Sequence, residues 1–532
     1  MRLTAKNLAP LLLVPTFGCS LGLPERQACG SDSQCVEFFG PGSVCQADGY
    51  CAGSSDGVDG VGTLVNGASA TTVRSIGIVA QTGTAAEIGI AYTAGMQASL
   101  ASTTPEERGG YDLQHYALDD GYLPENSAAL VQEVTADGSE RDDPRSDGGA
   151  DAIDGREAFA VVASVGSPTS AAMLETINAE QVPFIGTFSG APHLYNSPPD
   201  RVVWQFRPEY EDESYQLTRH LTQVRDPGRV PVNNVFVLAQ SPVTGPPCAG
   251  CAAAAAEDDQ TVLDAYGYAG YKGVRRLLQE QGVSQVEIPL ATYQANSIDM
   301  AVPVRYFSEW ITGLAEGAHP PELDGDGNIQ IGIVMIPVGL AGAEFIERIL
   351  DEMDQLALGQ RPGSLTDEEW AMVDEDWKTS LESADLVFTS ISPSGDGIAA
   401  TLATGNAEHA CGTFPIIVSQ VVPFPLGNSS AAIRFREELA AYDTTVEPGF
   451  AAFEGWVMGK LWAEMVRRTA LTGDVTADSL ISVLETNFDD VDLGVGAVIN
   501  FSQNDHLGSE QIFATRLDST CAHEDYSLDF GG

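Results

Sequence analysis

Short apolar runs alternate with amphipathic stretches along most of the chain, and this alternation predicts an α/β fold. Phe159–Ala163 is an apolar run of the length that a buried parallel strand needs. Ala171–Glu180 follows it with apolar residues on one helical face, and Val182–Ile185 is the next buried run. Strand, helix and strand in this order are typical of a mainly parallel sheet covered by helices.

A second block repeats this alternation after residue 210. Val235–Ala239 and Ile331–Val338 are apolar runs of strand length, and amphipathic stretches lie between them. Two similar blocks predict two doubly wound α/β lobes, each with its own mainly parallel sheet. Asp385–Ser390 and Ile416–Val422 are expected to add further strands.

Small hydroxyl residues follow two neighbouring strands of the first block. Ser167, Thr169 and Ser170 come after the first strand, and Ser189 and Gly190 come after the second. Because parallel strands end at one edge of a sheet, both loops are expected at the edge where such folds bind ligands. Hydroxyls and free N–H groups at a helix N-terminus suit a carboxylate or another anion. The alternative interpretation is that Ser and Thr simply cap the helix.

The N-terminus has the pattern of a bacterial export signal. Arg2 and Lys6 precede the apolar segment Leu8–Phe17, which is too short to span a bilayer. Residues 1–18 are therefore predicted to be a lipoprotein-type signal peptide, with Cys19 as the lipidated residue and only anchor to a bacterial membrane. Thr16 stands where a lipobox prefers Leu, so secretion without lipid is the alternative.

Nine cysteines agree with an oxidising location outside the cytoplasm. Residues 19–55 are predicted to be a small disulfide module with three possible pairings, and residues 56–72 a Gly/Ser linker. Cys248 and Cys251 form a CxxC in a Pro/Gly/Ala loop, which favours a structural disulfide over a redox site. Cys411 and Cys521 are the remaining pair and are expected to be bonded. The cysteines of the module are Cys29, Cys35, Cys45 and Cys51.

The chain is strongly acidic, with 75 acids against 26 bases and a net charge of −49. Such a charge repels nucleic acid and anionic membrane surfaces, so neither is expected as a partner. Acids occur in nearly every segment, which favours solvation over a dedicated acidic function. The hydrophobic content of 43% is enough for a soluble protein with a core.

Four motifs, in order along residues 73–520, carry a resemblance to a known family. Thr82–Gly89 reads TG-x-AA-x-x-G, Ser419–Pro425 reads SQVVPFP, and Glu454–Trp456 reads EGW. Gly508 and Ser509 close a final D-x-x-G-S. The chain thus resembles the type I periplasmic binding proteins, and more narrowly the branched-chain amino acid (Leu/Ile/Val) substrate-binding family of ABC transporters.

The resemblance implies two lobes that close over a small ligand about a hinge. It divides the chain into a first lobe of residues 73–209 plus about 384–490, a second lobe of 210–383 plus about 491–520, and a tail of 521–532. It implies that Ser167, Thr169, Ser170, Ser189 and Gly190 hold a ligand carboxylate, with Thr82 nearby and Tyr266 from the second lobe. Gly190 lacks the threonine hydroxyl common in the family, and Gly339-Leu340-Ala341 stands where an acid is expected.

The resulting hypothesis is an extracytoplasmic lipoprotein that captures a small polar ligand, an amino acid or related carboxylate or amide, for an ABC permease. A receptor or sensor of the same fold is the alternative. An enzyme is not expected, because the sequence has no G-x-S-x-G, HExxH or GxxxxGK[ST] motif. No cofactor or metal is expected either. A third class is an interaction protein whose functional contacts are made by the Cys-rich module.

Overall fold

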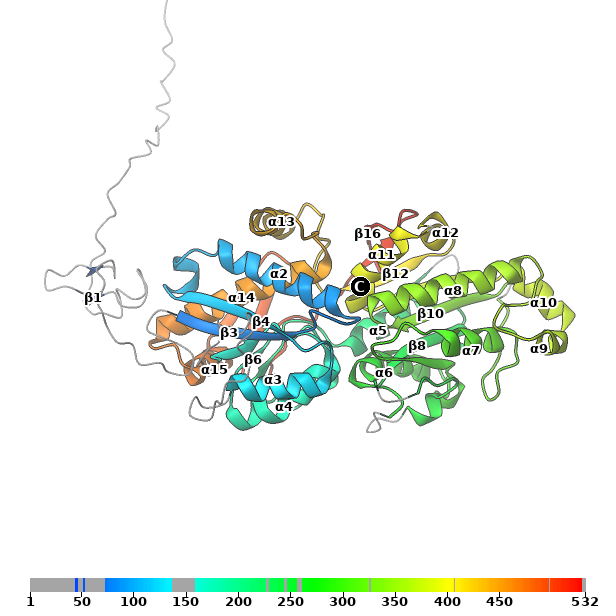
Figure 1. The fold of residues 1–532 in the computed structure, drawn as a ribbon, viewed down its shortest axis with the longest axis horizontal. Coiled ribbons are helices and arrows are strands. Elements are labelled where there is room, and N and C mark those ends of the chain that lie inside the picture. The colour runs from blue at the N-terminus through cyan, green and yellow to red at the C-terminus, as the bar shows by residue number, and fades with distance from the viewer. Residues whose placement is uncertain are drawn as a thin grey trace, which may run out of the picture.

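The structure is a computed structural model of the 532-residue chain. It describes residues 72–135, 158–225, 229–243, 246–255, 261–324, 327–405, 407–496 and 498–528. It also describes a two-stranded antiparallel pair, β1 (Val44–Cys45) and β2 (Cys51–Ala52). Two lobes lie side by side along the long axis of the molecule (Figure 1). The predicted signal peptide, Cys19, Cys29 and Cys35 lie outside the described residues, and of Cys45 and Cys51 only the paired backbone is described.

The first lobe contains a five-stranded parallel sheet in the order β4-β3-β5-β6-β7. Its central strand β5 is fully buried, as expected of an apolar run covered on both faces. The strands are β3 (Thr72–Val79), β4 (Asp112–Asp119), β5 (Ala160–Val162), β6 (Phe184–Ile185) and β7 (Val203–Trp204). The helices are α2 (Ala86–Ser102), α3 (Pro124–Thr135), α4 (Ser167–Glu180), α13 (Ser430–Tyr442), α14 (Phe450–Thr472) and α15 (Ala477–Thr486), with the antiparallel pair β13 (Phe488–Asp492) and β14 (Val498–Phe501).

The second lobe contains a seven-stranded sheet in the order β16-β15-β12-β11-β10-β8-β9. Its first five strands along the chain are parallel, and its last two are antiparallel. The strands are β8 (Val235–Ser241), β9 (Leu290–Gln294), β10 (Gln330–Ile336), β11 (Asp385–Ser390), β12 (Ile416–Gln420), β15 (Phe513–Leu517) and β16 (His523–Tyr526). The helices are α5 (Tyr210–Arg219), α6 (Ala265–Glu280), α7 (Ala301–Ile311), α8 (Gly339–Ala357), α9 (Asp367–Met372), α10 (Glu375–Leu381), α11 (Gly395–Thr404) and α12 (Ala407–Gly412).

The predicted fold class is confirmed, but the division of the chain between the lobes differs from the prediction. Residues 385–420 were expected in the first lobe, yet β11 pairs with β10 and β12 pairs with β11 in the second sheet. β14 was expected in the second lobe, yet Ile499 and Phe501 belong to the first hydrophobic core. The predicted tail contributes β16 to the sheet edge. An apolar run identifies a strand, but it does not name the strand's neighbour.

The two lobes are joined by three crossings of the chain, at 205–209, 421–429 and 502–512. The first and third crossings are hydrogen-bonded to each other. The Gln205 N–H donates to the His506 carbonyl at 2.9 Å, and the Gly508 N–H donates to the Gln205 carbonyl at 2.7 Å. Paired segments of this kind allow two lobes to rotate as rigid bodies about a common line.

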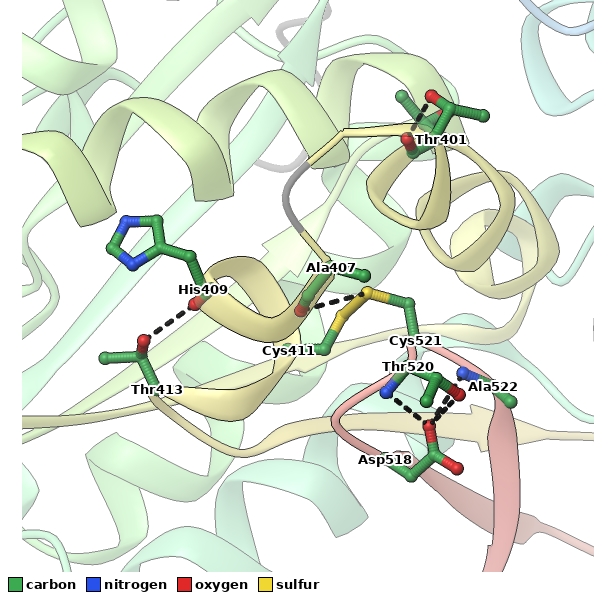
Figure 2. The surroundings of a disulfide bond; sticks show 10 residues. Thr401, Ala407, His409, Cys411, Thr413, Asp518, Thr520, Cys521 and Ala522 are labelled. Atoms are coloured by element: carbon green, nitrogen blue, oxygen red, sulfur yellow. Dashed lines mark hydrogen bonds between the residues drawn. A yellow bond between two sulfur atoms is a disulfide. The ribbon is translucent and has the colours of Figure 1, made fainter.

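Both disulfides predicted in the lobes are present. Cys248 and Cys251 close a short loop beside β9, while Cys411 and Cys521 join residues 110 positions apart. Figure 2 shows how the second bond ties α12 to the turn between β15 and β16. That turn is also held by the Asp518 carboxylate, which accepts from the backbone N–H groups of Thr520 and Ala522.

No helix in the described part of the chain is long and apolar enough to cross a bilayer.

Candidate functional site

The two hydroxyl loops predicted at the edge of the first sheet do meet. The Oγ atoms of Ser167 and Ser189 lie 2.9 Å apart, and both side chains are buried. Ser167 starts α4, where Gly166 adopts a φ of 109° that an L side chain rarely takes. Pro168 then occupies the first turn of the helix, where a missing N–H costs nothing. Local sequence therefore places the serine at the carboxyl edge of the sheet.

The hydroxyls of Thr169 and Ser170 bond within the first lobe. Thr169 donates to the Val165 carbonyl at 2.8 Å, four residues back, and Ser170 donates to the Ser167 carbonyl at 3.0 Å. Ser170 also lies 2.9 Å from Nε2 of His193, where burial lowers the pKa of the histidine to about 4. The capping interpretation is wrong for this loop, because the N-cap of α4 is Gly166 and no side chain caps the helix. The proposed carboxylate role of the loop stays a prediction.

Gly190 has a packing reason to lack a side chain. A Cβ at Gly190 would lie 2.6 Å from the backbone nitrogen of Tyr210 and 2.8 Å from the carbonyl oxygen of Pro208. The Tyr210 N–H donates to the Gly190 carbonyl at 2.9 Å. The crossing segment that leads into α5 therefore occupies the space that a threonine would need.

Tyr266 lies in the second lobe at the start of α6 and is buried. Its hydroxyl donates to the Pro337 carbonyl at 2.8 Å, and its ring meets Tyr210 edge to face at 5.3 Å. The aromatic contact places Tyr266 against the crossing segment, close to Gly190. Thr82 lies elsewhere on the edge of the first lobe, where it is exposed and donates to Asp119 at 2.8 Å. The structure brings Ser167 and Ser189 together, and Gly190 and Tyr266 both contact Tyr210.

A buried polar network lies behind Tyr266. Asp264 caps α6 by accepting from the N–H groups of Tyr266 and Gly267, at 3.0 and 2.8 Å. The Gln240 amide donates to its other oxygen at 2.6 Å and accepts from the Tyr293 hydroxyl at 2.7 Å. Burial raises the pKa of Asp264 to about 7 despite these three donors, since water no longer solvates the charge.

Tyr122 reaches from the first lobe into this network. It follows β4 with a φ of 60°, and its hydroxyl lies 3.4 Å from Nε2 of Gln240. Asn296 of the second lobe donates to the Tyr122 carbonyl at 3.3 Å and accepts from Thr84 at 2.9 Å. The Tyr122 ring is buried and belongs to the hydrophobic core of the second lobe. The lobes are therefore in direct contact at the carboxyl edges of their sheets.

A second buried cluster, centred on Arg207, crosses between the lobes at the hinge. Nη2 of Arg207 donates to Glu213 of α5 at 3.1 Å, and Nη1 lies 3.5 Å from Glu454 of α14. Ser392 bonds to both Arg207 and Glu213. Burial raises the pKa of Glu454 to about 7, although the Arg207 charge opposes the shift. Sequence reasoning noted Glu454 in the EGW motif but missed Arg207 and Glu213, because no local pattern marks a buried ion pair.

A cavity of about 600 Å³ opens between α2, α11 and the loop before α14. We call it the interlobe cavity. This volume is within the usual range for small-molecule sites. Phe188, between the two hydroxyl-bearing positions 187 and 189, contributes one wall. None of the seven predicted ligand-binding residues lines it. The other apolar walls include Ile88, Ala91, Pro393, Val446 and Ala451.

Four acidic residues line the interlobe cavity: Glu87, Asp396, Asp443 and Glu447. Asp396 accepts from the N–H of Ala451 at 3.1 Å, and Asp443 accepts from the N–H of Thr445 at 2.8 Å. The side chains of Glu87 and Glu447 make no hydrogen bond or ion pair with any residue that the structure describes. Glu87 as a whole residue is exposed to solvent, but its carboxyl is partly surrounded by protein. This partial burial of the carboxyl, and after it the nearby charge of Asp396, raise the pKa of Glu87.

The sequence matches no protein-family model and no curated protein. Solved structures match almost over their full lengths. A possible leucine/isoleucine/valine-binding protein from Rhodopirellula baltica is 19% identical with a TM-score of 0.62, covering 88% of this chain and 99% of its own. A fatty acid ABC transporter substrate-binding protein from Thermomonospora curvata is 12% identical with a TM-score of 0.61, covering 88% and 95%.

A third solved structure is a branched-chain amino acid ABC transporter protein from Thermus thermophilus with bound valine. It is 13% identical with a TM-score of 0.57, and the match covers 86% of this chain and 96% of that one. At such identities a likeness establishes the fold and leaves the ligand open. The chain therefore has the fold of the type I periplasmic binding proteins, a group of neighbours that includes substrate-binding proteins for branched-chain amino acids.

Proposed function

We propose that this protein is an extracytoplasmic ligand-binding protein that encloses a small molecule between its two lobes for an ABC transporter. The interlobe cavity carries the proposal. Glu87 and Phe188 line it from the first lobe, and Pro393 and Asp396 line it from the second. A ligand that contacts both lobes binds the closed arrangement better than the open one, so binding shifts the population toward closure.

The proposal includes export and a lipid anchor at Cys19. The sequence pattern of residues 1–18 supports both, and one structural neighbour is described as a substrate-binding periplasmic protein from Ralstonia solanacearum. The two disulfides of the lobes agree with an oxidising compartment. Mass spectrometry of the mature chain would detect diacylglycerol on Cys19, whereas an unlipidated Cys19 would support simple secretion.

The fold alone leaves the ligand open, because its neighbours include a protein with bound valine and a fatty acid substrate-binding protein. A carboxylate held by Ser167 and Ser189 would have to separate two hydroxyls that now bond to each other at 2.9 Å. A carboxylate in the interlobe cavity would face four acids. The sequence predicts a small polar ligand, and a test of this prediction should therefore include cationic, neutral and anionic molecules.

A screen of the full chain against small molecules tests the proposal. A ligand at 100 times its Kd adds about 2.7 kcal/mol of stability, which appears as a rise in Tm. Ala400 lines the cavity from the exposed face of α11, so Ala400→Trp should block binding without disturbing the core. Ala403→Trp, on the same helix and outside the cavity lining, should bind normally. A ligand whose Kd is unchanged by Ala400→Trp would place the binding site elsewhere.

A receptor or sensor without a transporter is the second candidate. Structures described as extracellular ligand-binding receptors, from Verminephrobacter eiseniae and Rhodopseudomonas palustris, share the fold. Uptake of the labelled ligand in cells that lack this protein separates the two roles. Transport predicts that uptake is lost, whereas a receptor role predicts normal uptake with an altered transcriptional response.

A further inference from the structure

We propose that the interlobe cavity binds an organic cation, a protonated amine carried on an apolar body. This inference rests on the proposed function, since it names the ligand class of the same cavity. It combines two observations, an apolar cavity formed by both lobes and an excess of acidic groups around it. Among the described residues, Asp396 is the only one of these acids with a basic side chain within ion-pair distance, His523 at 3.7 Å.

The charge around the cavity has one sign. Glu87 comes from α2, Asp396 from α11, and Asp443 and Glu447 from the loop that precedes α14. Among the residues that the structure describes, no lysine or arginine belongs to its lining. The Arg207 guanidinium lies 4.5 Å from the centre of the Phe188 ring, but it is already paired with Glu213 and Glu454. An anionic ligand would therefore meet repulsion, and a cation would meet attraction.

Two of the four carboxylates are left for a ligand. Asp396 and Asp443 accept hydrogen bonds from Ala451 and Thr445, which accounts for one oxygen of each, and the other oxygen of Asp396 lies 3.7 Å from Nε2 of His523. Glu87 and Glu447 have no such donors among the residues that the structure describes. Burial, and after it the like charge of Asp396, raise the pKa of Glu87, as expected of a carboxyl without a nearby cation. An ammonium group supplies three N–H donors and the missing charge.

The remaining surface requires an apolar body on this ammonium. Ile88, Ala91, Phe188, Pro393 and Val446 surround the space of about 600 Å³. Burying an alkyl or aryl group against such walls is favourable by about 25 cal/mol per Å² of apolar surface. A bare metal ion fits less well, because no group of three metal-ligating side chains is found among the described residues.

Isothermal titration calorimetry on the full chain tests this ligand class with two matched series. The first is 2-phenylethylammonium, phenylacetamide and phenylacetate, and the second is hexylammonium, hexanamide and hexanoate. Each series keeps the apolar body nearly constant while the charge changes from positive to neutral to negative. In at least one series, we expect the ammonium compound to bind at least about ten-fold more tightly than the matching amide and carboxylate. Its affinity should fall as salt is added.

Two substitutions locate the charge effect. Glu87→Gln should weaken ammonium binding about ten-fold, because a charge-assisted hydrogen bond is lost. Glu125→Gln removes the same charge from the first turn of a different helix of the first lobe, outside the cavity, and should leave the Kd within about two-fold. Equal effects of the two variants would mean that only the overall field of the protein matters and would overturn the site.

The remaining outcomes separate the ligand class from the proposed function. Tighter binding of an amide or carboxylate, blocked by Ala400→Trp, would overturn the cationic class and leave the ligand-binding role intact. If none of the six probes binds but another molecule in the broad screen does, the cationic class is overturned and the ligand-binding role stays intact. Failure of every molecule in both experiments would overturn the ligand-binding role together with this inference.

Discussion

At the start of α6, the single carboxylate of Asp264 holds two backbone N–H groups and the amide of Gln240. These donors favour the charged form, yet burial dominates and raises the pKa of Asp264 from 3.8 to about 7. The carboxyl thus binds a proton more tightly in the folded chain than in the unfolded one. Stability from this proton is fully present below pH 3.8 and is lost as the pH rises through about 7.

Asp264→Asn tests this residue. The free energy of unfolding of the wild type should fall by up to about 1.4 kcal/mol per pH unit, relative to the variant, as the pH rises from 5 toward 7. Asparagine does not titrate and still caps a helix, so the variant should lack this component of the slope. Urea unfolding at several pH values measures it. Parallel pH profiles for the two proteins would show that Asp264 does not titrate in this range.

At the scale of one element, the loop after β4 acts as a contact between the lobes. It places the Tyr122 ring 2.8 Å from where a Cβ of Gly166 would lie, and its hydroxyl lies 3.4 Å from the Gln240 amide. Tyr122 therefore fills the edge at which the predicted Ser and Thr loops end. This contact stabilises the arrangement of the two lobes that the structure shows.

Tyr122→Ala should shift the ligand-free protein toward an open arrangement, because the buried ring and the bond of its hydroxyl to Gln240 are lost. The expected change is a larger radius of gyration by small-angle X-ray scattering, reversed when a ligand is added. Tyr442→Ala removes an exposed tyrosine from the end of α13 and provides the control. An unchanged radius of gyration in Tyr122→Ala would mean that the hinge segments alone hold the lobes together.

Elements were predictable from the sequence to the extent that their own residues define them. The apolar run of β5 is a local signal and was interpreted correctly. The helix expected from Ala171 begins at Ser167, because the glycine and proline before it are also local start signals that the prediction did not use. The neighbours of β11 depend on which strand pairs with it, and nothing in DLVFTS specifies β10. The acids around the interlobe cavity come from three distant segments, so no motif could group Glu87 with Asp396.

For the whole molecule, the Cys411–Cys521 bond closes the longest covalent loop among the described disulfides. Between these cysteines the chain leaves the second lobe, forms α13, α14, α15, β13 and β14 of the first lobe, and returns. A cross-link that closes a loop of about 100 residues is expected to stabilise by up to about 4.7 kcal/mol, through the unfolded state.

Replacing both residues of the long-range bond, as Cys411→Ser with Cys521→Ser, should lower the free energy of unfolding by about 2–4 kcal/mol. The matched control replaces Cys248 and Cys251, which are separated by three positions and close a much smaller loop. Urea unfolding of the two double variants compares them directly. A larger loss in the Cys248/Cys251 variant would show that local packing of these bonds outweighs loop length.

The same long-range bond also determines what a protease can do to the protein outside the cell. The exposed turn between α13 and α14 lies inside the loop that Cys411 and Cys521 close. A single cut there creates two new chain ends, but both pieces stay covalently attached through the two sulfur atoms. The part of the first lobe that follows the second lobe in the sequence therefore cannot diffuse away from the rest. A nicked molecule keeps all its parts for refolding.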